Sequence, residues 1–85
     1  MKTISYPKIE TVAPLPDKRL LVRFSGGEER VYDCSPLLEQ EPFSALENES
    51  FFRQVKVDAG GYGVSWSDEI DLSESELWLG GAHDS

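Results

Sequence analysis

The chain has 85 residues, a formal net charge of −8 and a single cysteine. This length suits one small domain, residues 1–85, and the lone thiol excludes a disulfide within the chain and favours a reducing compartment. Phosphate backbones repel an acidic domain, so direct binding to nucleic acid is excluded as an expected function.

The acidic side chains are concentrated in the second part of the chain. Residues 1–34 hold six basic and five acidic side chains, whereas residues 35–85 hold two basic and eleven acidic ones. This distribution favours a basic partner, although acids also serve simply to keep a small domain soluble. No stretch approaches the roughly 18–20 apolar residues of a membrane span, and we expect a soluble, cytoplasmic protein.

The first predicted elements are strands. The segment VAPLPDKR indicates a strand end and a turn, because Pro14 and Pro16 fit only edge or terminal strand positions. The segment RLLVRFSGGEERVYDC follows and predicts a β-hairpin around two adjacent glycines.

The register of this hairpin follows from the alternation of its side chains. A two-residue loop at residues 26–27 would mix apolar and acidic groups on one face. A three-residue loop, Gly26–Glu28, instead pairs Val22 with Tyr32 and Leu20 with Cys34, so we expect this register. The side chains then expected on the buried face are Leu20, Val22, Phe24, Tyr32 and Cys34.

Two short helical segments are expected next. SPLLEQ predicts a short helix with Ser35 as its N-cap and Pro36 at the first helical position. NESFFRQ predicts another helical turn, capped by Asn48.

The segment VKVDAGGYGVSW predicts a second hairpin. A two-residue turn at residues 60–61 pairs Val57 with Val64 and Ala59 with Tyr62. All four side chains then share one face with the other apolar residues of the hairpin. The glycines are assigned to a turn and not to a phosphate-binding loop, because a strand and not a helix follows them.

The last predicted elements account for an unusually acidic segment, WSDEIDLSESELW at residues 66–78. The alternation of Ile70 and Leu72 with acids indicates a half-buried strand. Ser73 and Glu76 have the spacing of a capping box, in which the hydroxyl accepts from the Glu76 N–H and the carboxylate accepts from the Ser73 N–H. Most of these acids are therefore assigned to capping and to outward-facing strand positions.

The residue types needed for catalysis are scarce. His83 is the only histidine and stands in a terminal segment that we expect to fray, so no positioned base is available to Cys34. Cys34 is best explained as a small core residue. The acids at 68–71 lack the spacing of a calcium loop, and the chain has no cysteine–histidine set for zinc. We expect no catalytic residue, metal or cofactor.

The order of these pieces resembles the small bacterial family known as domain of unknown function 2442. The resemblance covers about residues 9–80 and lies in short motifs spread along that range. The matching positions are Phe24, Gly27-Glu28, Tyr32-Asp33, Leu37-Leu38, Phe52, Val55, Val57-Asp58, Gly60, Trp66, Asp71-Leu72 and Leu77-Trp78. The chain departs from the pattern at Ser67, where proline is frequent, and at Trp78, where tyrosine is common.

The resemblance implies an α+β fold of antiparallel strands and short helices, and a family without established catalytic residues. It also implies that the gene is often paired with a gene for another short protein, in an arrangement similar to a toxin–antitoxin pair. Some longer relatives carry an added helix-turn-helix domain.

We therefore predict an α+β fold of antiparallel β-hairpins with two or three short helices, including a capped C-terminal helix. The expected function is a non-catalytic, antitoxin-like module that binds a basic protein through its acidic C-terminal half. The side chains expected to contact that partner are Tyr62, Asp68, Glu69, Asp71 and Trp78.

Two alternatives stay open. One is a self-associating scaffold or subunit, a homodimer formed through a strand edge, with no catalytic activity. The other is a small metal-dependent hydrolase, which would require a cleft that brings together Asp33, Asp58 and the acids at 68–71.

Overall fold

A computed structural model describes residues 6–83 and shows two antiparallel sheets with short helical segments between and after them, the α+β fold that the sequence predicts. The first sheet has the order β1-β2-β3-β7 and the second the order β4-β5-β6. The strands are β1 Ile9–Leu15, β2 Arg19–Phe24, β3 Glu29–Asp33, β4 Lys56–Val57, β5 Gly63–Ser67, β6 Ile70–Ser73 and β7 Ala82–His83. The α-helices are α1 Glu49–Phe52 and α2 Glu74–Gly80, and the 3-10 turns are η1 Pro16–Lys18, η2 Ser35–Glu39, η3 Phe43–Glu47 and η4 Ala59–Gly61.

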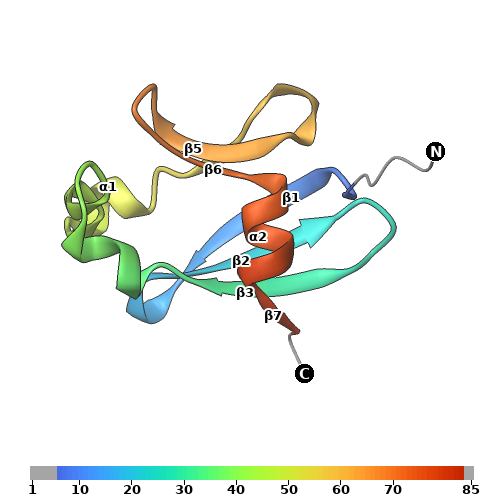
Figure 1. The fold of residues 1–85 in the computed structure, drawn as a ribbon, viewed down its shortest axis with the longest axis horizontal. Coiled ribbons are helices and arrows are strands. Elements are labelled where there is room, and N and C mark those ends of the chain that lie inside the picture. Colours follow the sequence, from blue (N-terminus) through green and yellow to red (C-terminus); the bar gives the residue numbers. More distant parts are fainter. Residues whose placement is uncertain (1–5, 84–85) are drawn as a thin grey trace.

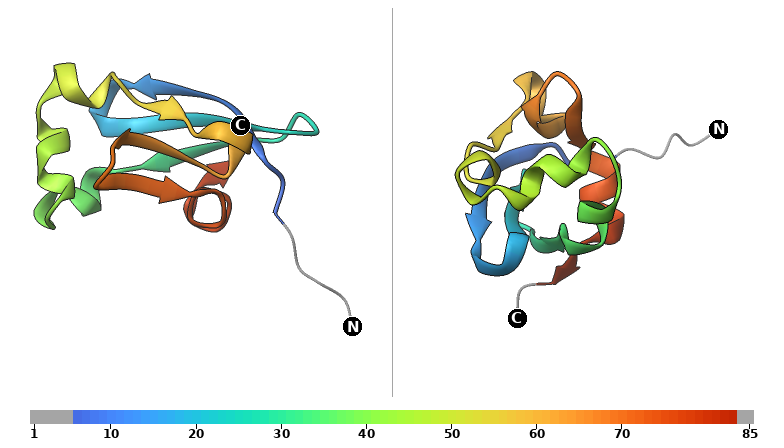
Figure 2. Two further views of the ribbon diagram at one scale, coloured as in Figure 1. Left: turned by 90° about the horizontal axis from the view of Figure 1, so that it is seen from above. Right: turned by 90° about the vertical axis from the view of Figure 1, so that its left-hand side faces the viewer.

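The two sheets lie one above the other with the core between them (Figure 1). On one side β4 contacts β1, and on the other side α2 contacts both β6 and β3. The segment that contains η2, η3 and α1 closes one end of the molecule, as both views in Figure 2 show. Among the described residues, none of the helices has the length and apolar character that crossing a membrane requires.

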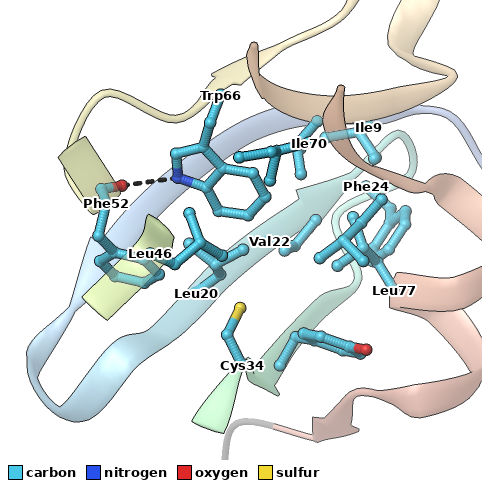
Figure 3. Packing of buried hydrophobic residues seen from close by; sticks show 13 residues of the cluster. Ile9, Leu20, Val22, Phe24, Cys34, Leu46, Phe52, Trp66, Ile70 and Leu77 are labelled. Carbon is cyan, nitrogen blue, oxygen red and sulfur yellow. Dashed lines mark hydrogen bonds between the residues drawn. The ribbon is translucent and has the colours of Figure 1, made fainter. Parts of the chain in front are cut away.

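The core takes side chains from both sheets, from α2 and from the end segment (Figure 3). Trp66 reaches from β5 toward the end segment, where its indole N–H donates to the Phe52 carbonyl oxygen at 2.8 Å. Phe52 and Trp66 also stack, with ring centroids 6.1 Å apart. The fully buried side chains are Phe24, Phe52, Leu20, Leu46, Leu77, Val22, Val64 and Cys34.

The β2–β3 hairpin confirms the predicted buried face but corrects its register. Leu20 pairs with Tyr32 and not with Cys34, and Phe24 N–H donates to the Glu28 carbonyl oxygen at 2.8 Å. The loop therefore has three residues as expected, but they are Ser25–Gly27 and not Gly26–Glu28. A shift of two residues leaves every side chain on its predicted face, because side chains alternate with a period of two.

The second hairpin has the predicted register but a longer loop. Val57 pairs with Val64 as expected. The Asp58 N–H donates to the Gly63 carbonyl oxygen, and the four residues from Ala59 to Tyr62 form the connection, with η4 inside it. The predicted Ala59–Tyr62 pair is therefore wrong.

The N-cap residues follow the sequence in two of three cases, although the Glu76 carboxylate accepts from the Tyr32 hydroxyl and not from the predicted Ser73 N–H. Asn48 accepts from the Phe51 N–H at the start of α1, and Ser73 accepts from the Glu76 N–H at the start of α2. The 3-10 turn η2 differs, because Cys34 occupies the N-cap and Ser35 is already the first residue of the turn. Asp33, the residue before the N-cap, has its carboxylate accepting from the Ser35 N–H at 2.9 Å.

The segment predicted to fray forms a short strand. Residues 82–83 make up β7, which pairs with β3 through Val31 and Ala82 and through Arg30 and His83. The backbone of His83 is therefore ordered at the edge of the first sheet.

Candidate functional site

The described part of the chain, residues 6–83, contains no pocket. It also contains no group of three or more histidine, cysteine, aspartate or glutamate side chains placed to bind a metal ion. Asp33 lies at the end of β3 in the first sheet, where its carboxylate accepts from the Ser35 N–H. Asp58 lies beside the second sheet, where its carboxylate accepts from the Ser65 hydroxyl at 2.6 Å. These residues therefore do not form the cleft that the hydrolase alternative requires.

Two buried ionisable groups are held in their neutral forms. Burial raises the pKa of the Cys34 thiol to about 12, and the neighbouring Asp33 carboxylate acts in the same direction. Burial also raises the pKa of Tyr32 far above its ordinary value, and the hydrogen bond to Glu76 adds to this effect. A nucleophilic thiolate at Cys34 is therefore strongly disfavoured at neutral pH, and its predicted place in the core is confirmed.

Tyr62 lies at the end of the β4–β5 connection, with its side chain largely in solvent. The residue is 60% exposed, whereas the predicted pairing would have placed it on the buried face. The ammonium group of Lys8 lies 4.4 Å from the centre of its ring, within the range of a cation–π contact. Lys8 also forms an ion pair with Glu74 at 2.8 Å. The Tyr62 ring is thus exposed but flanked by one cation.

Asp68 and Glu69 form the two-residue turn of the β5–β6 hairpin. Ser67 pairs with Ile70 across this turn, and both acids are exposed. Asp71 follows on β6 opposite Ser65, on the outer face of the second sheet. The three acids are therefore close along the chain and accessible, as the sequence predicts.

Trp78 is half-buried on α2 and makes contacts within the molecule. Its ring lies edge-on to Phe24, with centroids 5.0 Å apart and an angle of 86° between the planes. The Arg30 guanidinium carbon lies 3.9 Å from the Trp78 ring centroid, and Arg30 itself is buried. Trp78 therefore links α2 to the first sheet.

The structure does not bring all five predicted contact residues together. Tyr62 precedes β5 and Asp68 follows it, so the strand holds them at opposite ends of the second sheet. Six residues at a rise of about 3.3 Å each separate these positions by about 20 Å. Figure 1 shows the same separation, with the β4–β5 connection and the β5–β6 turn at opposite ends of the second sheet.

A cluster that the sequence analysis did not single out lies at the Asp68 end. The β5–β6 turn and the end segment from η2 to α1 lie at the same end of the molecule in Figures 1 and 2. We call the exposed carboxylates of these two segments the acidic end. They are Glu39, Glu41, Glu47, Glu49, Asp68 and Glu69.

The acidic end has little compensating positive charge. Residues 35–53 and 67–70 contain these six acids and one basic residue, Arg53. Lys18, which belongs to η1, forms an ion pair with Glu49 at 2.5 Å. The sequence signal for this cluster was the run of acids between residues 39 and 49, but only the fold shows that the turn at 68–69 joins it.

Comparison with known proteins places the chain in a family. No curated protein and no solved structure shows significant similarity to it. The family described as Protein of unknown function (DUF2442) matches residues 9–83, which confirms the resemblance noted from the sequence motifs. Because this match covers all seven strands and both α-helices, the chain belongs to the DUF2442 family.

Proposed function

We propose that the chain is a protein-binding module whose acidic end recognises a basic surface on a protein partner. The observation that carries this proposal is the convergence of two distant segments, residues 39–49 and 68–69, on one end of the molecule. Their six carboxylates are all exposed, and among them only Glu49 forms an ion pair, with Lys18. Charges gathered in this way attract a cationic partner and increase its rate of encounter.

Partly exposed apolar side chains in the same end segment supply the contact area that affinity requires. Electrostatic attraction mainly raises the association rate, whereas buried apolar contacts account for most of the binding free energy. Four side chains of η2, η3 and α1 pack against the core and keep part of their surface in solvent. They are Leu37, Leu38, Phe43 and Phe51.

An antitoxin-like role is the specific form of this proposal. The family resemblance implies a gene partner that encodes another short protein, and a basic protein is the kind of partner that the acidic end would attract. The module then acts by covering the partner's surface and has no catalytic residue of its own.

The test is to co-express the chain with the protein encoded by the adjacent gene and to measure association rates by stopped flow across a salt series. We expect a complex whose association rate falls steeply as salt rises, because the Debye length shrinks from about 10 Å at 0.1 M to about 3 Å at 1 M. Glu69→Lys and Glu47→Lys should each slow association at low salt and change dissociation much less.

Glu10→Lys is the matched control for these variants. Glu10 is also exposed, but it lies at the start of β1, on the side of the molecule away from the end segment (Figure 1). The proposal is wrong if no complex forms, if the association rate does not depend on salt, or if Glu10→Lys slows association as much as Glu69→Lys does.

A further inference from the structure

The face of the first sheet that points away from the core carries an apolar row across all four strands. Leu20, Val22 and Phe24 are buried, so Leu21 between them points to the opposite face. The pairing of the strands aligns one residue from each strand with Leu21, and we call this set the apolar row. Its members are Ala13, Leu21, Val31 and Ala82.

No described element covers the apolar row. Leu21 and Val31 are only half-buried, and neither belongs to the set of side chains that pack against the core. Ala13 and Ala82 are exposed. Figures 1 and 2 show the second sheet, both α-helices and the end segment elsewhere, with no ribbon across the outer face of the first sheet.

Charged residues flank the apolar row on both sides in an ordered pattern. On one side Arg23 of β2 pairs with Glu29 of β3, and their side chains form an ion pair at 3.3 Å. On the other side Arg19 of β2 pairs with Asp33 of β3. In both rows the cation is on β2 and the anion is on β3.

These flanking rows are balanced in charge. They contain two arginines and two carboxylates, whereas the whole chain carries a net charge of −8. A strongly basic partner gains no net electrostatic attraction at this face. Two copies of the chain repel each other less through this face than they would through the acidic end. The neutral pattern therefore favours a second copy as the occupant.

We propose that two copies of the chain pack these outer faces together around a twofold axis that runs parallel to the strands, between β2 and β3. Such an axis exchanges the positions of β2 and β3 in the facing sheet. Arg23 then lies opposite Glu29 of the second copy, and Arg19 lies opposite Asp33 of the second copy. Leu21 meets Val31 of the second copy at the centre, in the aligned packing that paired sheets adopt.

The other simple twofold arrangement is disfavoured by the same residues. An axis along the apolar row would place Arg23 opposite Arg19 of the second copy and Glu29 opposite Asp33. Like charges in contact across an interface are costly. The charge pattern therefore selects one of the two orientations.

The size of the face indicates a weak, reversible dimer. Four strands about 4.8 Å apart and five residues at about 3.3 Å each give a footprint of roughly 300 Å². A stable interface buries about 800 Å² per partner, so this dimer forms only at high concentration. The acidic ends lie outside the contact, and both remain available to the partner proposed above.

The first experiment measures the oligomeric state of the chain by sedimentation equilibrium, from about 10 μM to about 1 mM. We expect a reversible monomer–dimer equilibrium. Leu21→Glu should raise the dissociation constant about tenfold or more, because it would bury a charge at the centre of the interface. The matched control is Leu79→Glu, since Leu79 is 70% exposed on α2 and lies outside the proposed contact.

The second experiment uses charge reversal and tests the axis itself. Arg23→Glu alone and Glu29→Lys alone each place like charges together at both symmetry-related contacts. An equimolar mixture of the two variants restores opposite charges at both contacts, so it should form a heterodimer with about the affinity of the unmodified chain. Circular dichroism of each variant verifies that these surface changes leave the fold intact.

The proposal is overturned if the unmodified chain stays monomeric at the highest concentration, or if Leu79→Glu weakens the dimer as much as Leu21→Glu. It is also overturned if the mixed variants associate no better than either one alone. A dimer that Arg23→Glu strengthens would indicate the other axis. Binding of the neighbouring gene's protein is measured separately, so failure of the dimer leaves the proposed partner interaction intact.

Discussion

The polar groups buried in this small core join elements that are distant in the sequence. The indole of Trp66 donates to Phe52 in the end segment, and the Tyr32 hydroxyl donates to Glu76 at 2.8 Å, which ties β3 to α2. Among the described residues, every buried side-chain nitrogen and oxygen has a hydrogen-bond partner. Each bond therefore stabilises one arrangement of the elements, since breaking it would leave a buried polar group unsatisfied at a cost of about 1–3 kcal/mol.

Cys34 predicts a loss of stability at alkaline pH. The ordinary pKa of the thiol is 9.0, and burial raises it to about 12 in the folded chain. The contribution of this thiol to stability is fully present below pH 9, where the thiol is protonated in both states. It is lost as the pH rises from 9 towards 12, because there the thiol ionises in the unfolded chain but not in the folded one. Within this window the free energy of unfolding should fall by about 1.4 kcal/mol per pH unit through this one group.

Urea unfolding of the unmodified chain and of Cys34→Ala between pH 8 and pH 11 measures this contribution. Cys34→Ala lowers stability at every pH because it removes a buried sulfur atom, but its stability should depend less steeply on pH above 9. Tyr32 titrates in the same direction in both proteins, and most of its effect cancels, because burial and Glu76, the main causes of its raised pKa, are present in both. Identical slopes would show that the Cys34 thiol ionises as readily in the folded chain as in the unfolded one.

Among the elements, the β4–β5 connection places one of its glycines, Gly61, against the backbone of β1. Gly61 has φ +76°, and a Cβ added there would lie 2.6 Å from the Ile9 carbonyl oxygen. Gly26, in the β2–β3 loop, has φ +97° and open space around it. Both positions carry the strain of a left-handed backbone, about 1–2 kcal/mol for a residue other than glycine, but only Gly61 adds a backbone clash.

We therefore expect Gly61→Ala to lower the free energy of unfolding clearly more than Gly26→Ala. The excess arises because the second sheet would have to move away from β1 at this point. Chemical denaturation of both variants gives the comparison. Equal losses would mean that β1 and the connection separate easily, and that their close approach contributes little to the fold.

The sequence predicted the elements and their buried faces better than it predicted how the strands pair with one another. Alternation in β2 and β3 identifies the inward side chains, but it cannot distinguish registers that differ by two residues. The missed signal was charge, because only the observed register places Arg23 opposite Glu29 and Arg19 opposite Asp33. The pairing of β7 with β3 was missed because two residues are too few to show a pattern.

The acidic end was predicted only in part, because the sequence shows which acids are exposed but not which segments the fold brings together. Asp68 and Glu69 are exposed in a turn, as their position before a strand suggested. Their grouping with the acids of the end segment depends on how the second sheet lies over the first, and no local pattern contains that information. Tyr62 is exposed because the loop is longer than two residues, which two adjacent glycines do not reveal.

At the scale of the whole molecule, the negative charge is distributed unevenly over the surface. The acidic end collects six exposed carboxylates, whereas the rows that flank the outer face of the first sheet are neutral. Charges of one sign on a small domain repel each other and lower the stability of the folded state. That repulsion should be concentrated at the acidic end and should be strongest at low ionic strength.

Removing one charge from each region tests this distribution. Glu69→Gln should raise the thermal midpoint of unfolding in about 10 mM salt, where the Debye length of about 30 Å spans the whole acidic end. A gain of about 0.5 kcal/mol would raise the midpoint by roughly 2–4 °C in a domain of this size, and the gain should vanish in about 1 M salt. Glu10→Gln, which removes the same charge far from the acidic end, should change the midpoint less at low salt. Differential scanning calorimetry of both variants at the two salt concentrations measures these shifts in the midpoint. Equal shifts for the two variants would mean that the repulsion arises from the total charge of the chain and is not concentrated at the acidic end.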